Sequence, residues 1–254
     1  MKLHSRHHTL LALALLLACV IGCKYSTSSS SSSSSNTSND EKKTTNSSAT
    51  NTSTAPDTPP DIAGKYNVTG TNPDGGGYKG SLEVIPHGDV YQFRWSAGNQ
   101  SDGVGITNGG VVAVAFASGA NGKGCGVVDY AIKSDGTLDG KWGYWGTDES
   151  GTERASRTGG SGLVGDYDAT GKNPNGKEYK EKLTVESAAG NLYRFSWSNN
   201  TEGLGIKQGD NVAVGIGGAR CGFVAYEIKS DGTLDGIWGG YGSEKTGTEK
   251  AMKQ

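Results

Sequence analysis

The sequence predicts an all-β protein in which two tandem antiparallel modules, each an up-and-down β-barrel or a sandwich, follow a disordered tether. Three observations lead to this prediction. Glycine supplies 42 of the 254 residues and hydrophobic residues only 33%, which suits short strands and tight turns better than helices. Apolar and polar residues alternate along much of the chain beyond residue 61. That part of the chain also repeats itself once.

The charge balance limits the classes of partner. The chain carries 24 Lys and Arg against 26 Asp and Glu, a formal net charge of −2. It therefore lacks the general basic character of nucleic-acid-binding domains, and we expect no nucleic-acid partner. The low aliphatic content also disfavours helical bundles, doubly wound α/β enzymes and polytopic membrane proteins.

Residues 1–22 have the organisation of an export signal. Lys2 and Arg6 precede Leu10–Gly22, an unbroken run of apolar or small residues. This run is too short to cross about 30 Å of hydrocarbon as a helix, but it matches the core of a signal peptide. The segment Val20–Cys23 resembles the lipobox of bacterial lipoproteins.

The lipobox resemblance implies a lipid anchor on Cys23. In such lipoproteins the cysteine sulfur carries diacylglycerol, and the cysteine becomes the N-terminus after cleavage. Residue 24 is Lys rather than Asp, which the resemblance associates with the outer membrane or cell surface. The implied partner of this end of the chain is the membrane itself.

The segment 23–61 begins with the lipidated Cys23 and continues as a tether. Of residues 24–61, 13 are Ser and 8 are Thr, without hydrophobic periodicity. Such a segment cannot bury enough apolar surface to offset its ordering entropy, so we expect disorder. A flexible coil of this length has an end-to-end distance of roughly 35 Å, which would hold a folded head clear of the lipid.

The head consists of two tandem repeats of one module, at 62–157 and 163–254, joined by the Gly/Ser-rich stretch 158–162. The nine residues 132–140, IKSDGTLDG, recur unchanged at 228–236. Other recurring segments are Gly64–Tyr66 with Gly165–Tyr167, Tyr91–Trp95 with Tyr193–Trp197, Gly103–Ile106 with Gly203–Ile206, Val112–Val114 with Val212–Val214, Cys125–Gly126 with Cys221–Gly222, and Gly151–Glu153 with Gly247–Glu249. Chance does not produce such agreement, so the repeat defines the organisation of the head.

Within each copy, hydrophobic residues have a period of two, as in Leu82 and Val84 or in Tyr91, Phe93 and Trp95, which marks one face of a strand. We count seven or eight strands per module. The dipeptide Asp135-Gly136 between two such segments predicts a two-residue type I′ hairpin. Sequential hairpins indicate a meander, and eight strands can close into a barrel. A sandwich per module, or one larger barrel assembled from both copies, is the alternative.

A family resemblance covers each copy nearly from end to end. The string G-x-Y-x-V-x-G-x-N-P-x-G-x-x-Y begins at Gly64, an aromatic strand ends in Trp95, and D-G-x-L-x-G-x-W begins at Asp135. A G-T-E triplet closes each copy. Together these resemble small exported bacterial modules described as fibronectin-binding. The resemblance implies adhesion at the cell surface, and it transfers no binding residue.

The sequence does not indicate an enzyme. His87 is the one histidine outside the signal, and the second copy has Ala there, so a catalytic triad finds no support. No zinc-binding or other metal motif occurs, and we expect no metal or cofactor. Glu153 and Glu249 could form a glycosidase pair, but the sequence does not determine their separation.

The cysteines Cys125 and Cys221 occupy equivalent positions in the two copies. In regular strands each lies opposite the Tyr130 or Tyr226 face, off the module core, where the two could meet at an inter-repeat contact. Export permits a disulfide between them. The alternative is two buried thiols, with the glycine after each cysteine forming a bulge that turns the side chain inward.

Tyr144, Trp145 and Tyr241 are the candidate ligand-binding residues. Trp145 lies three positions after Trp142, so in a regular strand the two side chains would point to opposite faces. Trp145 lies beside Tyr144 and a Gly-rich loop, and its counterpart in the second copy is Tyr241. An exposed aromatic shelf of this kind could stack on sugar rings or anchor a partner protein. The alternative is that these rings cover a neighbouring strand or the other repeat.

These observations predict a non-enzymatic, lipid-anchored binding protein at the bacterial outer membrane or cell surface. The first expectation is an adhesin for a host matrix protein or a glycan, with the duplication raising the effective concentration of sites. The alternatives are a barrel carrier for a small apolar ligand and a structural envelope lipoprotein whose repeats pack only on each other.

Overall fold

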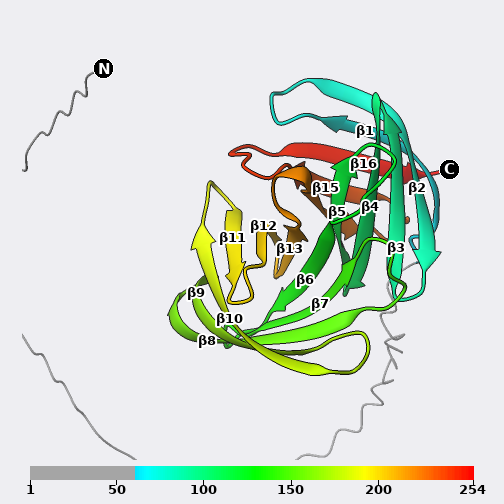
Figure 1. Ribbon diagram of the computed structural model, residues 1–254. Coiled ribbons are helices and arrows are strands. Elements are labelled where there is room, and N and C mark those ends of the chain that lie inside the picture. Colours follow the sequence, from blue (N-terminus) through cyan, green and yellow to red (C-terminus); the bar gives the residue numbers. More distant parts are fainter. Residues whose placement is uncertain (1–60) are drawn as a thin grey trace, which may run out of the picture. The chain divides into compact units, whose positions relative to one another are not determined.

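The computed structural model describes residues 61–254 (Figure 1), so the signal, Cys23 and nearly all of the tether lie outside it. The described residues form sixteen strands and one short 3-10 turn, and no helix among them is long and apolar enough to cross a membrane. The first repeat forms β1 (Gly64–Thr71), β2 (Gly77–His87), β3 (Val90–Ala97), β4 (Asn99–Asn108), β5 (Val111–Ser118), β6 (Gly126–Ile132), β7 (Leu138–Tyr144) and β8 (Gly151–Ser161). The second forms β9 (Val164–Lys172), β10 (Glu178–Ser187), β11 (Leu192–Trp197), β12 (Glu202–Gln208), β13 (Asn211–Ile216), the 3-10 turn Gly218–Arg220, β14 (Gly222–Ile228), β15 (Leu234–Gly239) and β16 (Gly247–Lys253).

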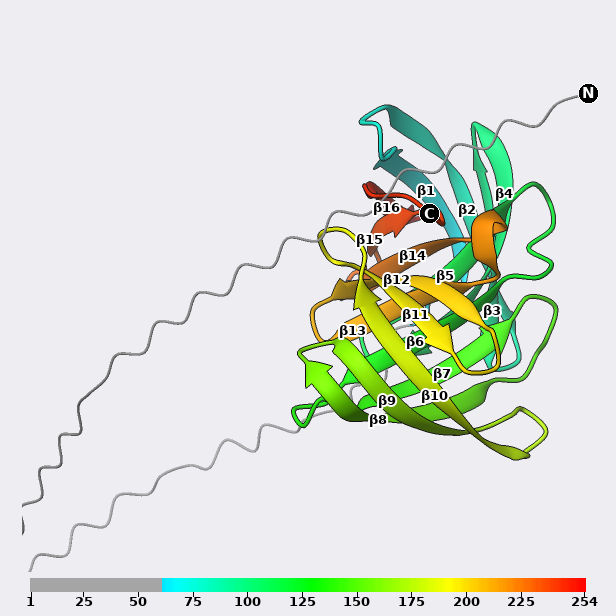
Figure 2. The ribbon, with the colours of Figure 1, turned by 60° about the vertical axis from the view of Figure 1, so that its left-hand side comes forward.

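These strands close into two antiparallel eight-stranded barrels, which confirms the predicted fold class (Figures 1 and 2). Barrel A has the order β1-β16-β15-β14-β5-β4-β3-β2, and barrel B has the order β10-β11-β12-β13-β6-β7-β8-β9. Each barrel therefore takes five strands from one repeat and three from the other. The two repeats exchange their last three strands, an arrangement that neither one barrel per repeat nor a single joint barrel describes.

Two seams in each barrel join the repeats. In barrel A, β1 pairs with β16 and β5 pairs with β14. In barrel B, β8 pairs with β9 and β13 pairs with β6. The Gly/Ser-rich stretch expected to link two separate modules is instead mostly strand, because Gly160 pairs with Gly165 and Ser161 with Val164 in the β8–β9 hairpin. The repeat boundary lies inside barrel B rather than between the barrels.

The exchange predicts which engineered cysteines will join. Asn67 on β1 faces Met252 on β16, and both side chains are exposed. The N67C/M252C variant should form a disulfide on oxidation, because facing antiparallel residues lie within disulfide reach, about 4.5–5.5 Å between Cα atoms. Denaturing mass spectrometry of a proteolytic digest would detect the cross-linked peptide.

The matched control is N67C/S156C. Ser156 is the first repeat's counterpart of Met252, and it pairs with Asp168 in barrel B. A barrel made from one repeat would instead place Ser156 opposite Asn67. A cross-link in this control, and none in N67C/M252C, would contradict the exchange.

The interior of each barrel is an aromatic and aliphatic core drawn from both repeats. In barrel A the Phe93 ring stacks on Tyr226 of the second repeat at 6.2 Å between centroids. In barrel B, Tyr130 stacks on Phe195 of the second repeat at 6.0 Å. Leu82 is 1% exposed and faces inward, as the period of two predicted. The alternation therefore determined which side chains face the core, while the partner strands came from the other copy.

A third hydrophobic cluster lies between the barrels. Val104 and Ala113 of barrel A and Val127 and Ile206 of barrel B are buried in it, together with both cysteines. The run Val112–Ala117 is apolar at every position because its odd residues face this cluster and its even residues face the barrel interior. Contacts between β4 and β6, β4 and β7, and β5 and β13 hold the two barrels together as one compact unit.

Cys125 and Cys221 form a disulfide at the points where the chain crosses between barrels. Cys125 ends the β5–β6 crossover and Cys221 ends the β13–β14 crossover. Both sulfurs lie in the inter-barrel cluster, off the two barrel cores. The bond therefore ties together the two segments through which the repeats exchange their strands.

Asp129 is the charged residue that the inter-barrel contact buries most completely. Its side chain is 0% exposed, Asn211 Nδ2 donates to Oδ1 at 3.2 Å, and Oδ2 has no partner among the described residues. Burial raises the pKa of Asp129 to about 8, against the lowering effects of Asn211 and of the Lys141 charge. The carboxyl is therefore protonated in the folded protein at pH values where the unfolded chain has lost the proton.

The stability of the double barrel should accordingly fall as the pH rises from about 4 to about 8. In this interval the folded state binds more protons than the unfolded state, so the free energy of unfolding decreases with pH and then levels off. The Asp129→Asn variant cannot ionise, and we expect it to be more stable by about 2 kcal/mol at pH 8. Urea denaturation at pH 5 and pH 8 measures both quantities. An equal pH dependence in the variant and the wild type would contradict this assignment.

The predicted type I′ hairpin at Asp135-Gly136 is wrong. Lys133 O accepts from Gly136 N, and Lys133 N donates to Thr137 O, which gives a longer loop. Within residues 133–137, Gly136 alone has a positive φ, of 82°, whereas a type I′ turn would require it at Asp135 as well. Asp135 instead accepts the Thr137 amide at 2.9 Å, so the loop is a type I turn followed by a left-handed glycine. The second repeat has the same loop at 229–233.

Candidate functional site

A buried glutamate lies inside each barrel, surrounded by aromatic donors. In barrel A, Glu249 on β16 is 5% exposed. Its Oε1 accepts hydrogen bonds from the Trp95 indole at 2.8 Å and from the Tyr226 hydroxyl, and its Oε2 accepts from the Tyr78 hydroxyl at 2.8 Å. Tyr78 and Trp95 belong to the first repeat, whereas Tyr226 and Glu249 belong to the second. The strand exchange therefore makes this constellation a joint product of the two repeats.

Barrel B contains the equivalent constellation around Glu153 on β8, which is also 5% exposed. Oε1 accepts from the Trp197 indole at 3.1 Å and from the Tyr130 hydroxyl, and Oε2 accepts from Tyr179 at 2.9 Å. Every donor and every acceptor atom corresponds to that of barrel A. The two sites are thus copies of one design.

Glycines on neighbouring strands make room for the aromatic rings at these sites. A side chain at Gly171 would lie 2.3 Å from the Tyr179 ring, and one at Gly151 would lie 2.2 Å from Trp142. In barrel A, Gly70 leaves the same space for the Tyr78 ring, and Gly247 leaves it for the Trp238 ring. Rings that lie over cross-strand glycines are held by the sheet itself. Part of the high glycine content therefore belongs to the strands rather than to the turns.

Burial sets the electrostatics of both sites. Desolvation raises the pKa of Glu249, and the hydrogen bonds from Tyr226, Trp95 and Tyr78 act in the opposite direction. Desolvation, followed by the neighbouring carboxylate, raises the pKa of Tyr78 and of Tyr179 far above the usual range. The tyrosines therefore remain protonated donors. In barrel A the three hydrogen bonds partly offset the cost of burying the Glu249 carboxylate.

A pocket opens next to each glutamate. Pocket A, of about 410 Å³, is lined by Tyr78, Trp95, Phe116, Trp238 and Glu249, with Asn72, Asn99 and Ser101 among its polar residues. Pocket B, of about 360 Å³, is lined by Trp142, Tyr144, Tyr179, Trp197 and Glu153, with Asn173, Asn199, Thr201 and Glu181. Aromatic walls with a few converging polar groups are typical of small-molecule sites.

The structure separates the three predicted ligand-binding residues. Tyr144 lines pocket B and packs edge-on against Trp142 at 5.8 Å. Trp145 and Tyr241 are half-buried and pack against the inter-barrel cluster. Trp145 also borders a cavity of about 100 Å³ beside His87. No common aromatic shelf of these three residues forms, because the strand exchange turns Trp145 and Tyr241 toward the joint between the barrels.

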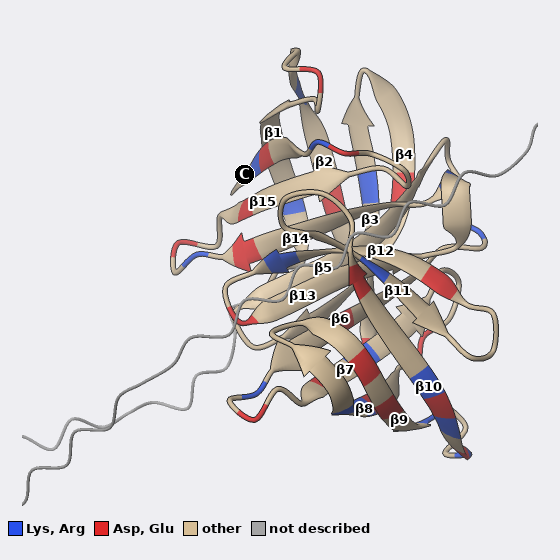
Figure 3. Ribbon diagram, turned by 90° about the vertical axis from the view of Figure 1, so that its left-hand side faces the viewer, with Lys and Arg blue, Asp and Glu red and all other residues tan. Residues whose placement is uncertain are grey.

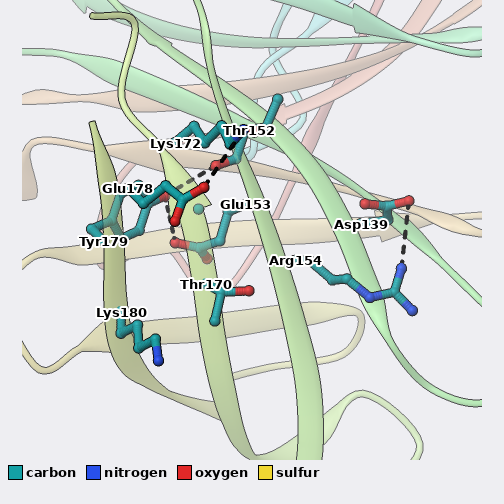
Figure 4. Close-up of a pocket in the computed structure, with 10 residues that line it drawn as sticks. Asp139, Thr152, Glu153, Arg154, Thr170, Lys172, Glu178, Tyr179 and Lys180 are labelled. Carbon is teal, nitrogen blue, oxygen red and sulfur yellow. Dashed lines mark hydrogen bonds and ion pairs between the residues drawn. The ribbon is translucent and has the colours of Figure 1, made fainter. Parts of the chain in front are cut away.

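A further depression, of about 500 Å³, lies over β7 to β10 of barrel B and shares Glu153 and Tyr179 with pocket B (Figure 4). Four of its exposed charged side chains form two ion pairs, Arg154 with Asp139 at 4.0 Å and Lys172 with Glu178 at 3.6 Å. Exposed pairs of this kind contribute little energy. This depression is therefore a weaker candidate than the repeated pockets.

The geometry bears on catalysis and metal binding as well. Glu153 and Glu249 lie in different barrels, so they cannot flank one glycosidic bond. Within residues 61–254, no group of three or more His, Cys, Asp or Glu side chains is arranged to hold a metal ion. Each of the two sites combines aromatic donors, an aromatic pocket wall and one buried carboxylate.

Trp95, Trp142, Trp197 and Trp238 occupy equivalent positions in the two copies, and the sequence alone did not connect them with the glutamates. The signal was present, because the shared family string contains Tyr78, Trp95 and the G-T-E glutamates. The sequence does not show which strands pair, so it could not reveal that these residues meet. Comparison with models of protein families, with curated proteins and with solved structures found no match to this chain.

Proposed function

We propose that this chain is an exported, lipid-anchored binding protein that holds one small ligand in each of its two barrel pockets. The observation that carries the proposal is the duplication of an entire site: a buried glutamate, three aromatic donors and an adjoining aromatic pocket recur in both barrels. A merely structural carboxylate needs no adjoining pocket of this size.

The dimensions of both pockets suit a small molecule. Ligand sites in proteins range over about 300–1,000 Å³ and are mainly apolar with a few placed polar groups. Pockets A and B, at about 410 and 360 Å³, lie within that range. The polar residues Asn72 and Asn173 occupy equivalent positions in the two pockets. Two equivalent sites on one chain would raise the apparent affinity for a ligand that carries repeated groups.

The sequence supports the location of this binding activity. The signal, Cys23 and the Ser/Thr-rich tether predict attachment to the outer membrane or cell surface, with the head held away from the lipid. The double barrel supplies the part that binds. Together they describe a receptor or carrier that is retained at the envelope.

Adhesion to a glycan is the second candidate, since a terminal sugar ring could enter the same aromatic pockets. Docking of a matrix protein on a flat apolar surface has less support. Among residues 61–254, only Val164 and Met252 are large hydrophobic side chains with high exposure. Lys and Arg are interspersed with Asp and Glu along strands such as β10 (Figure 3), which favours neither nucleic acid nor another strongly charged partner.

Native and denaturing mass spectrometry of the full chain in detergent would test the proposal. We expect up to two small molecules per chain in the native spectrum, either co-purified or acquired from a metabolite library. Tryptophan fluorescence would report the same event, because four of the five tryptophans line the pockets.

The variants Trp238→Leu and Trp142→Leu should each remove one site, whereas the control Trp145→Phe, outside both pockets, should retain two. Binding of a matrix protein or glycan that survives both pocket variants would overturn the proposal in favour of adhesion elsewhere. A head that acquires no ligand and cross-links only to envelope neighbours would favour the structural alternative.

A further inference from the structure

The carboxylate in each pocket has one acceptor position left. An ionised carboxylate accepts about four hydrogen bonds. Glu249 uses two on Oε1 and one on Oε2, and Glu153 does the same. Both glutamates line their pockets. Each pocket therefore presents a buried carboxylate whose Oε2 can accept one more hydrogen bond.

Aromatic rings line each pocket beside the glutamate. In pocket A, the distance between ring centroids is 6.3 Å for Trp238 and Tyr78, 6.1 Å for Trp238 and Phe116, and 5.7 Å for Phe116 and Trp95. These four rings form a continuous wall. In pocket B, the centroid of the Trp142 ring lies 5.8 Å from that of Tyr144 and 6.5 Å from that of Tyr179. The negative π-faces of such rings attract compact cations.

Among residues 61–254, no Lys or Arg lines pocket A or pocket B. Arg154, Lys172 and Lys180 line the adjoining depression that also contains Glu153, and Arg154 and Lys172 are paired there with Asp139 and Glu178. Pocket B carries a second carboxylate, Glu181, which is half-buried and accepts a hydrogen bond from the Ser198 hydroxyl. The equivalent position in the first repeat is Gly80. Burying a carboxylate without a cation is costly, so both pockets favour a positively charged occupant, and pocket B does so more strongly.

We infer that the ligand of both pockets carries a compact organic cation, an ammonium or quaternary ammonium group, held between the glutamate and the surrounding aromatic rings. This inference rests on the proposed function and specifies its ligand class. A primary ammonium would donate to the free acceptor position on Oε2. A quaternary ammonium would be held by charge and by the ring faces alone.

A pair of probes of equal shape tests the charge. Choline and its neutral isostere 3,3-dimethyl-1-butanol would be titrated into the full chain labelled with ¹⁵N in detergent, and the five indole N–H signals followed by NMR. We expect choline to shift the signals of Trp95, Trp142, Trp197 and Trp238 while that of Trp145 stays in place. Choline should bind roughly tenfold more tightly than the isostere.

Glu181→Gln provides a variant that leaves the buried glutamates intact. It should weaken choline binding at Trp142 and Trp197 by roughly threefold to tenfold and leave Trp95 and Trp238 unchanged. The matched control is Glu186→Gln on the exposed face of the same strand, which should change neither site. Glu249→Gln would test pocket A directly, but its fold must first be verified.

The outcomes separate the two proposals. Equal binding of choline and the isostere, or no shift with choline, overturns the cationic ligand. In that case the mass-spectrometry screen decides whether the pockets bind a neutral ligand, which would preserve the proposed function. Pockets that stay empty in both experiments would overturn both proposals.

Discussion

Removing the Cys125–Cys221 disulfide is expected to lower the free energy of unfolding of the double barrel by about 4–5 kcal/mol. The bond closes a loop with a sequence separation of 96 residues, and its absence restores the conformational freedom of that loop to the unfolded chain. Both sulfurs are buried, with Cys125 0% and Cys221 4% exposed, so the C125A/C221A variant is a better test than reduction of the native protein. Urea denaturation followed by tryptophan fluorescence would measure the difference.

Two controls identify the origin of this effect. A reductant present during denaturation should destabilise the wild type and leave C125A/C221A unchanged. The variant should also retain the fold, because the strand ladders of all four inter-repeat seams remain. A wild type whose denaturation midpoint is insensitive to reductant would refute the disulfide.

Replacing Glu249 with Ala should destabilise the protein by about 3–5 kcal/mol. The change leaves the Tyr226 hydroxyl, the Trp95 indole and the Tyr78 hydroxyl without their acceptor inside barrel A. Each unsatisfied buried donor costs about 1–3 kcal/mol, and loss of the side chain adds a cavity. Thermal or urea denaturation would measure the loss, and Glu153→Ala should cause a similar one in barrel B.

Matched variants separate the hydrogen-bond network from the general effect of removing an acid. Asp235→Ala on the exposed face of β15 should change stability by less than about 0.5 kcal/mol. Tyr226→Phe combined with Glu249→Ala should cost less than the sum of the two single changes, because the phenylalanine ring has no donor to leave unsatisfied. A Glu249→Ala protein as stable as Asp235→Ala would show that the network contributes nothing.

The repeat and the alternation of side chains are sufficient to predict most of the architecture. Leu82, Phe93 and Tyr130 face barrel cores because a strand turns successive side chains to opposite faces. The nine identical residues at 132–140 and 228–236 form the same loop and strand in both copies. These features depend on local spacing, which a sequence displays directly.

Turn geometry was only partly determined by the residues. Asp135-Gly136 allows a type I′ hairpin, and the period-two pattern around it is compatible with several loop lengths. The Asp135 carboxylate accepts the Thr137 amide, which favours the longer loop with a single left-handed glycine. The choice depends on a side-chain hydrogen bond that residue types alone do not specify.

The sequence by itself predicted an export signal and a lipidated Cys23, and it showed that the head contains two copies of one strand pattern. Only the tertiary structure decided which copy pairs with which. Because the repeats are so similar, β1 finds nearly equivalent edge residues on β8 and on β16, and no local pattern distinguishes them. The strand exchange brings Glu249 to Tyr78 and Trp95, and it places the cysteines at the crossover. The barrel A site therefore depends on two contacts between residues more than 150 positions apart, those of Glu249 with Tyr78 and Trp95, which only closure of the barrel brings together.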